Sequence, residues 1–237
     1  MKELKLLNLY PDLLDLYGDS GNLKILKYRM EQRNYKLVID NYSIDDSKPD
    51  FSSYDIIFAG GGTLKEYKSI YDDLYIYKED LQKAINDGVF FILINSSYHL
   101  FGRVETSNED LKGLEIFDYS TKYFEKITDH VIGNIVLDVT LNDASTKVYG
   151  FENHNAYVYN VSSPFGNVLE GKGNNETDSN EGYFTENVLA THLHGPLLSR
   201  NPDLSDYILK YCLERKYNEE ITFQNLDDTF EKRARGI

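Results

Sequence analysis

Hydrophobic and polar positions follow two periodicities over the first hundred residues. Four short apolar runs, bounded by polar or glycine-containing turns, show the pattern of buried strands: Leu4–Tyr10, Tyr35–Tyr42, Tyr54–Ala59 and Val89–Ile94. Between them apolar residues recur at helical spacing, at Leu23, Leu26 and Met30 and again at Leu74, Tyr77, Leu81 and Ile85. Strands that alternate with helices predict a doubly wound α/β fold, with a mostly parallel sheet flanked by helices.

The pattern changes after about Gly113, where short strands separated by turns replace the alternation. We expect strands at 132–140, 147–151, 156–159 and 166–169, which either extend the sheet or form an added antiparallel lobe. A polar loop at 171–182, an apolar strand at 187–192 and a helix with an apolar stripe from Leu204 to Cys212 follow. No segment resembles a linker. We therefore expect one domain over residues 1–215 and a charged, partly helical tail over 216–237.

Charge and composition narrow the class of partner. Thirty-nine acidic against 25 basic residues give a formal net charge of −14, which disfavours nucleic acid and anionic membranes as partners. No apolar run is long enough to cross a membrane and the first ten residues do not resemble a signal peptide, so we expect a cytoplasmic protein. The single cysteine, Cys212, excludes an intramolecular disulfide and a cysteine-rich zinc site, and its place on an apolar helix stripe favours a core position.

The segment from Ile92 to Gly102, ILINSSYHLFG, is the clearest chemical feature. It predicts a buried strand, a sharp turn and a helix, the arrangement on which many α/β enzymes mount a nucleophile. The turn holds Asn95, Ser96 and Ser97 and no cysteine. A second turn, Gly60–Gly62, follows the preceding strand. Its glycines allow a tight turn that directs N–H groups at an anion or oxyanion. The alternative is a plain strand-to-loop turn.

Histidines and an aspartate elsewhere point to acid–base chemistry. His192 and His194 lie two apart, which places both on one face of an extended segment. A metal site would need a third ligand that the sequence does not offer, so we predict neither a metal nor another cofactor. His194, followed by glycine and proline, suits a general base at the end of a strand or a structural histidine. Asp19 fits a helix N-cap and a carboxylate that orients the base equally well.

Six segments occur in an order typical of one family. They are LYGDSGNL, DIIFAGGG, ILINSSYHLFG, GFENH, GKGNN and THLHGPLLSRNPDLSDYIL, within about residues 5–215. On these segments the chain resembles the class I glutamine amidotransferases of the cobyric-acid-synthase type, and within them the amidotransferase subunits of lipid II isoglutaminyl synthase. The resemblance implies a subunit that hydrolyses glutamine and passes ammonia to a Mur-ligase-like, ATP-dependent synthetase. That partner amidates the stem-peptide D-glutamate of peptidoglycan precursors.

The family's site residues carry over to this sequence in part. The resemblance implies that His194 is the base, that Asp19 supports it and that Gly61 lies in the loop that gives one oxyanion-hole N–H. Tyr98 sets the register of the turn after the fourth strand, together with the glycine that ends the segment. That register places Asn95 where the family has its cysteine nucleophile.

Further positions depart from the family pattern. Ser96 and Ser97 replace two glycines of the turn, and His99 replaces a glutamine. His130 falls where the family has an arginine that helps bind substrate, and Tyr157 stands at another arginine. The resemblance therefore places Ser96 and His130 in the substrate-binding part of the site, with altered chemistry.

These departures predict that cysteine-dependent glutaminase activity is lost. An asparagine cannot form the required thioester, and removing a nucleophile from a protease triad costs roughly a million-fold in kcat. Asparagine tolerates a positive φ, so the turn can keep its shape. We expect a non-hydrolysing subunit that binds or scaffolds a Mur-ligase-like partner. The alternatives are an amidohydrolase that uses Ser96 with His194 or a site rearranged around His99, His130 and His194, and a regulatory module that senses intact glutamine.

Overall fold

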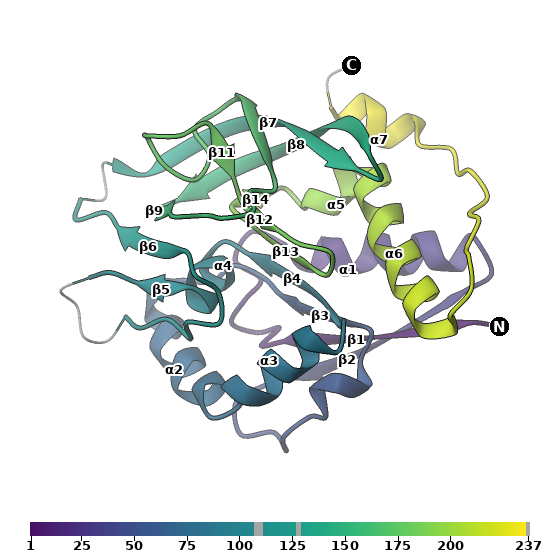
Figure 1. The fold of residues 1–237 in the computed structure, drawn as a ribbon, viewed down its shortest axis with the longest axis horizontal. Helices are drawn as coiled ribbons and strands as arrows, with labels where there is room; N and C mark the ends of the chain where they lie inside the picture. The colour runs from purple at the N-terminus through teal and green to yellow at the C-terminus, as the bar shows by residue number, and fades with distance from the viewer. Residues whose placement is uncertain (107–110, 127–128, 236–237) are drawn as a thin grey trace.

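A six-stranded sheet forms the centre of the fold in the computed structural model, which describes residues 1–106, 111–126 and 129–235 (Figure 1). Five strands run parallel and the edge strand β12 runs antiparallel. The strand order is β12 (Tyr183–Phe184), β13 (Val188–Thr191), β4 (Phe90–Ile94), β3 (Ile56–Ala59), β1 (Glu3–Leu9) and β2 (Lys36–Tyr42). All four strands predicted in the first hundred residues are present.

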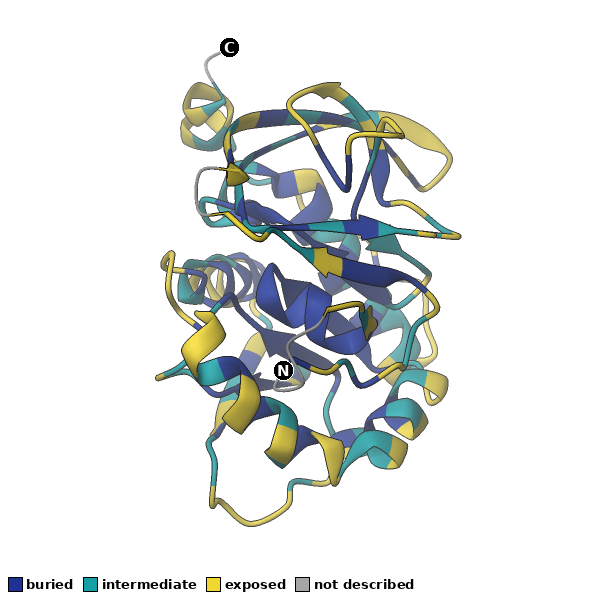
Figure 2. Ribbon diagram, turned by 90° about the vertical axis from the view of Figure 1, so that its left-hand side faces the viewer, coloured by how far each residue is buried: buried dark blue, intermediate teal, exposed yellow. Residues whose placement is uncertain are grey.

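Helices cover both faces of this sheet because its strands send alternate side chains into two apolar clusters. Ile56 and Phe58 of β3 lie in the cluster that holds α1 (Ser20–Glu31), α5 (Leu197–Arg200) and α6 (Pro202–Tyr217). Ile57 and Ala59 lie in the cluster that holds α2 (Leu64–Tyr75), α3 (Lys78–Asn86) and α4 (Ser96–Phe101). Figure 2 shows the buried residues concentrated between these layers. The predicted doubly wound α/β fold is confirmed.

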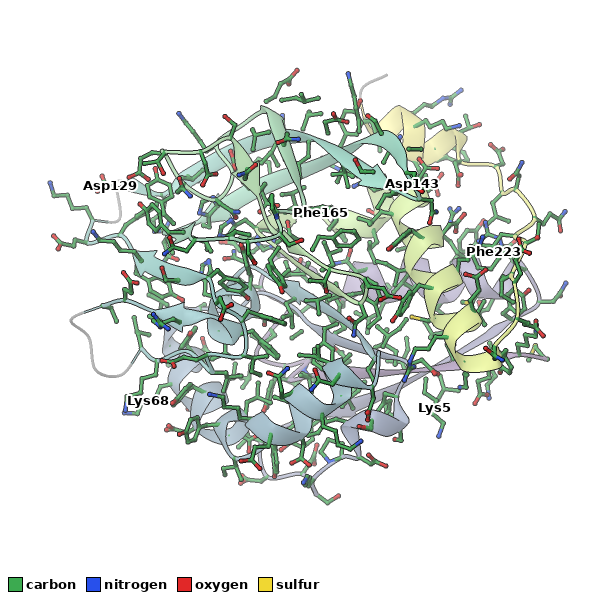
Figure 3. All side chains as sticks on the ribbon, in the orientation of Figure 1. Lys5, Lys68, Asp129, Asp143, Phe165 and Phe223 are labelled. Carbon is green, nitrogen blue, oxygen red and sulfur yellow. The ribbon has the colours of Figure 1, made fainter. Side chains whose placement is uncertain are left out.

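The second half of the chain adds two smaller sheets. One is antiparallel, in the order β11 (Asn180–Glu181), β10 (Gly166–Glu170), β7 (Val131–Leu141), β8 (Ala144–His154) and β14 (Leu193–His194). Asn142 and Asp143, both with positive φ, form the two-residue turn between β7 and β8, and Asp143 is labelled in Figure 3. The other contains β5 (Arg103–Val104), β6 (Ser120–Tyr123) and β9 (Ala156–Tyr159). The predicted strands after Gly113 thus mostly form a separate lobe, whereas β13 returns to the parallel sheet.

Two local expectations need correction. The predicted helix through Leu74 and Ile85 is split into α2 and α3, because the Tyr77 N–H donates to the Leu74 carbonyl and the chain turns there. The turn lets the Tyr77 ring pack against Phe51, in the short 3₁₀ helix η1 (Phe51–Ser53), at 5.8 Å between centroids. The predicted polar loop at 171–182 ends in the short strand β11, which pairs with β10.

The tail after α6 follows α1 and ends in α7 (Thr229–Ala234). Arg29 and Arg33 of α1 hold it in place, with donor-to-acceptor distances of 2.7 Å to Asp228 and 2.9 Å to the Gln224 carbonyl. Phe223, labelled in Figure 3, stacks on the Arg33 guanidinium at 4.4 Å. The last two residues of the predicted tail, 236–237, lie outside the described residues. No helix in the described part of the chain is long and apolar enough to cross a membrane.

Candidate functional site

The predicted site residues meet at the carboxyl edge of the parallel sheet. Asp19 follows β1, Gly61 follows β3, Asn95 follows β4 and His194 follows β13. Neighbouring parallel strands present their carboxyl ends at one edge, so side chains far apart in sequence come together there. His194 and Asp19, 175 positions apart, are in hydrogen-bonding contact. The fold therefore brings these four predicted residues together.

Asn95 occupies the sharp turn between β4 and α4. Its φ of 51° and ψ of −110° lie where few non-glycine residues are found, and asparagine is among those that tolerate a positive φ. The Asn95 N–H donates to the Thr191 carbonyl at 2.8 Å, and its carbonyl accepts from the His99 N–H at 3.1 Å. These bonds hold the strand–turn–helix shape that was expected to mount a nucleophile, with asparagine at its apex.

The Asn95 side chain is oriented by its neighbours. Its Nδ2 lies 2.9 Å from the Asn153 carbonyl, which can only accept, so the amide nitrogen must face this carbonyl. The same Nδ2 lies 2.7 Å from His194 Nε2. The second amide hydrogen therefore points at Nε2, which must be unprotonated to accept it. The lone pair that a general base would use is occupied by Asn95.

The other nitrogen of His194 faces Asp19. Nδ1 lies 3.2 Å from Asp19 Oδ1, and the second carboxylate oxygen accepts from the Gly61 N–H at 2.9 Å. Asp19 makes no side-chain cap on α1, so its carboxylate orients the histidine rather than the helix. The Tyr17 ring covers the imidazole, with 4.5 Å between ring centroids. His194 is thus a buried imidazole with Nδ1 directed at a carboxylate and Nε2 at an amide.

The glycine turn lies against this group and its N–H groups are engaged. A Cβ on Gly61 would come within 3.2 Å of both Asn95 Cβ and His194 Cε1, so only glycine fits without displacing them. The Gly61 N–H, expected to serve an oxyanion, is bound to Asp19, and the Gly62 N–H donates to Ser96 Oγ at 2.8 Å. Among the described residues no hydrogen bond joins Ser96 to His194. The serine side chain is directed at the glycine turn.

A cavity of about 170 Å³ opens beside Asn95. His130 contributes to its wall, so the structure brings this predicted residue together with Asn95 and Ser96. No lysine, arginine, aspartate or glutamate is among the lining residues, which are Leu16, Tyr17, Gly62, Thr63, Leu64, Asn95, Ser96, Tyr123, His130, Asn153, His154 and Asn155. The pocket is therefore polar but carries no permanent charge.

His99 does not line this pocket but lies behind it in a second imidazole cluster. Its Nε2 is 2.9 Å from His192 Nε2, and the His154 ring stacks on His192 at 3.9 Å between centroids. Burial lowers the pKa of His99 to about 3 and that of His192 well below its ordinary value, so both rings are neutral. Within the described ranges, no group of three or more histidine, cysteine, aspartate or glutamate side chains is arranged to hold a metal ion.

Several contacting groups were not anticipated from the sequence. Asn153 and His154 belong to the GFENH segment, which could have indicated them. Tyr123 ends β6 and Glu181 ends β11, and neither belongs to a motif, although both contact the histidine cluster. Glu181 is fully buried, which raises its pKa to about 8 against the opposing effect of hydrogen bonds from the His192 N–H and Thr191.

Comparison with known proteins agrees with this geometry. Strands, turn and histidine together define an α/β glutamine amidotransferase-like fold. PurLQS from Thermotoga maritima matches 92% of this chain and 100% of its own chain with a TM-score of 0.61 and 14% identity. A second solved glutamine amidotransferase matches 87% of this chain and 98% of its own with a TM-score of 0.55, also at 14% identity. At these identities the likeness concerns the fold.

Sequence comparison identifies the family. Residues 5–202 match the CobB/CobQ-like glutamine amidotransferase domain. The GatD subunit of lipid II isoglutaminyl synthase (glutamine-hydrolyzing) from Staphylococcus aureus is 35% identical over 218 residues, which are 91% of this chain and 87% of the relative. The Streptococcus pneumoniae GatD is 35% identical over 231 residues, 95% of this chain and 86% of the relative. This chain therefore belongs to the CobB/CobQ-like glutamine amidotransferase family.

Proposed function

We propose that this chain is a non-hydrolysing member of its family, which keeps the binding and docking role of an amidotransferase subunit without cleaving glutamine. The observation that carries the proposal is Asn95, whose amide occupies the nucleophile position and donates to both His194 Nε2 and the Asn153 carbonyl. A neutral amide cannot act as a nucleophile. Its hydrogen bond to His194 Nε2 also occupies the lone pair that a general base would use.

Three further features support the loss of hydrolysis. Asp19 and Ser96 occupy the N–H groups of Gly61 and Gly62, which leaves these two donors unavailable to a developing oxyanion. The pocket contains His130 but no guanidinium, so it lacks the bidentate donor that suits an amino-acid carboxylate. The catalytic and the binding parts of the site have therefore changed together.

The Ser96 alternative finds less support. A serine nucleophile needs a base within hydrogen-bonding reach, whereas Ser96 Oγ accepts from Gly62 and His194 Nε2 is bound to Asn95. Activation would require both hydrogen bonds to break. Sensing of intact glutamine rests on the remaining pocket, whose uncharged wall offers amide and imidazole groups to a polar ligand.

The proposed partner is a Mur-ligase-like, ATP-dependent synthetase. The support is the likeness to proteins named as subunits of lipid II isoglutaminyl synthase, over 87% and 86% of their lengths. In such an assembly this chain would shape or scaffold the synthetase, which would draw ammonia from another source. Glutamine is the ligand to test first at the pocket.

A glutaminase assay tests the catalytic part of the proposal. We expect no glutamate release above background from the purified chain, alone or with its partner synthetase, and no change in His194→Ala. Glutamate release by the wild-type chain that is abolished by His194→Ala would contradict the proposal. Asn95→Cys is the matched gain-of-thiol variant. Because Cys212 is fully buried, any reaction of Asn95→Cys with a soluble thiol reagent reports on the site.

Co-expression with the Mur-ligase-like synthetase of the same organism tests the docking part. We expect the two chains to co-elute in size-exclusion chromatography at equal stoichiometry, with wild-type and His194→Ala chains alike. Separate elution at micromolar concentrations of both chains would contradict the docking role. Calorimetric titration with intact glutamine separates a sensor, which releases or absorbs heat on binding, from a scaffold that does not bind it.

A further inference from the structure

A continuous chain of polar groups runs from the pocket into the interior. Tyr123 lines the pocket, and its hydroxyl lies 3.1 Å from His99 Nδ1. His99 Nε2 lies 2.9 Å from His192 Nε2, and His192 Nδ1 lies 3.3 Å from Glu181 Oε1. Both imidazoles and the carboxyl group are at most 1% exposed. Tyr123, His99 and His192 are joined by these hydrogen bonds, and Glu181 lies 3.3 Å from His192 Nδ1, a buried nitrogen without a hydrogen-bond partner among the described residues.

Two hydrogen-bond patterns fit the chain. The two facing Nε2 atoms share one hydrogen, because one must donate and the other must accept. With Glu181 ionised, His192 keeps its hydrogen on Nδ1, the nitrogen 3.3 Å from the carboxylate, so His99 donates from Nε2 and Tyr123 donates to His99 Nδ1. With Glu181 protonated, its O–H donates to Nδ1 once a small rotation aligns the two groups, and every donor along the chain is reversed. Neutral rings favour this exchange of tautomers over the formation of an imidazolium.

We propose that Tyr123, His99, His192 and Glu181 form a proton relay, in which protonation of the buried carboxylate reverses the hydrogen-bonding direction of the tyrosine in the pocket. This goes beyond the loss of hydrolysis, because the relay belongs to the unliganded chain. Only its effect on a bound ligand rests on the proposed binding function.

The transfer balances proton by proton. A water molecule in the pocket gives one proton to the Tyr123 oxygen, and the original hydroxyl proton passes to His99 Nδ1. The proton on His99 Nε2 passes to His192 Nε2, and the proton on His192 Nδ1 passes to Glu181 Oε1. Each ring gains one proton and loses one, so both stay neutral. One hydroxide remains in the pocket and one carboxylate becomes a carboxylic acid.

The pocket end has a second acceptor that permits the reversal. The Tyr67 hydroxyl donates to the Lys112 carbonyl at 3.0 Å, and its oxygen interacts with the Tyr123 hydroxyl. Once His99 donates to Tyr123, the tyrosine O–H can turn from His99 to Tyr67 or to a ligand. The pocket then offers a donor where it previously offered an acceptor.

The groups around Glu181 determine the pH at which its carboxyl group ionises. Glu181 accepts from the Thr191 hydroxyl and from the His192 N–H, both at 2.8 Å, which stabilises the carboxylate. Burial and the nearby carboxylate of Glu152 oppose ionisation, and together these effects raise its pKa to about 8. The titratable groups that face the relay from the adjoining elements are Glu152, His154, Tyr98, His194 and Tyr67. None of them is a permanent cation.

Imidazole ¹H–¹⁵N correlation spectra of the unliganded chain test the relay, because they distinguish Nδ1–H from Nε2–H tautomers. On lowering the pH from about 10 to about 6, we expect the tautomer ratios of His99 and His192 to invert together at one midpoint, by more than about tenfold each. Exposed His130 provides a reference signal in the same spectra. Rings that keep one tautomer throughout, or invert at separate midpoints, would overturn the proposal.

Glu181→Gln should lock the relay. The His192 N–H requires an acceptor at the Oε1 position, so the carboxamide places its oxygen there and its NH₂ toward Thr191, whose hydroxyl can accept. His192 then keeps Nδ1–H at every pH. The matched control is Glu152→Gln, which should retain the inversion at a lower pH because a like charge is removed. Thr191→Val, which removes a stabilising donor, should move the midpoint upward. An inversion that persists in Glu181→Gln would also overturn the relay.

Discussion

Two buried imidazole groups lie side by side in this molecule and differ in how firmly their protons are placed. His194 has one fixed partner on each nitrogen, the Asp19 carboxylate and the Asn95 amide. His99 and His192 face one another through chemically identical nitrogens, so the direction of their shared bond depends on Tyr123 and Glu181. The first group is locked into one tautomer, whereas the second has two.

The cause of this difference is the character of the neighbouring groups. A backbone carbonyl such as that of Asn153 can only accept, and it fixes the Asn95 amide and hence the proton on His194. A carboxyl group and a phenol can each donate or accept, according to protonation and rotation. A single amide can thus hold one buried histidine in a fixed tautomer, while an adjoining network keeps the capacity to respond to pH.

The largest effect is expected on the rate of glutamine hydrolysis when Asn95 and Ser96 are replaced together. In an Asn95→Cys background, Ser96→Gly removes the hydroxyl that occupies the Gly62 N–H. One oxyanion-hole donor is worth about 10²–10³ in kcat, so the double variant should hydrolyse glutamine about 100-fold faster than Asn95→Cys alone. Steady-state glutamate release measures the ratio. Ser97→Gly in the same background is the control, because Ser97 bonds to the Gly60 carbonyl and frees no N–H. Equal rates for the double variant and the control would show that Ser96 does not restrain the site.

An intermediate effect is expected on stability around the switchable group. The pKa of Glu181 is about 8 in the folded chain and near 4.5 when unfolded, so the folded state binds more protons in this window and loses stability as pH rises through it. Glu181→Gln removes this loss. Relative to wild type, it should gain about 2 kcal/mol between pH 6 and 8, since one pKa unit is worth about 1.4 kcal/mol. Urea unfolding at both pH values measures the gain. A stability difference that is independent of pH would contradict the raised pKa of Glu181.

The smallest effect is expected on the free energy of unfolding below about pH 6.5. The pKa of His99 is about 3 when folded and near 6.5 when unfolded, so the unfolded state binds more protons between these values, and stability is lost as pH falls below about 6.5. His99→Gln cannot titrate and should gain about 1 kcal/mol on wild type between pH 6 and 5. Thermal unfolding in matched buffers checks the slope. Parallel curves for the two proteins would mean that His99 is already protonated in the folded state.

Much of the fold and part of the site could be predicted from the sequence. Continuous apolar runs and helical stripes identified β1, β3 and β4 and their alternation with helices, because burial on both faces of the sheet leaves a local pattern. The family resemblance, with Tyr98 and Gly102 setting the register, places Asn95 at the position expected for the nucleophile. The two helices α2 and α3 were merged, because the stripe continues across a turn that is set by the packing of Tyr77 on Phe51.

The sequence by itself determined the layered α/β class, the absence of a cysteine at Asn95 and the candidacy of Asp19 and His194, since each follows from local spacing or residue type. Only the tertiary structure decided which atoms meet. It placed the Asn153 carbonyl against Asn95, which turns the Asn95 amide nitrogen toward His194 Nε2. It also placed Glu181 beside His192 at the end of the relay. These contacts join segments far apart in the chain, β8 to the turn after β4 and β11 to the residue after β13. Their pairing depends on how the three sheets pack together, and no short stretch of sequence records that.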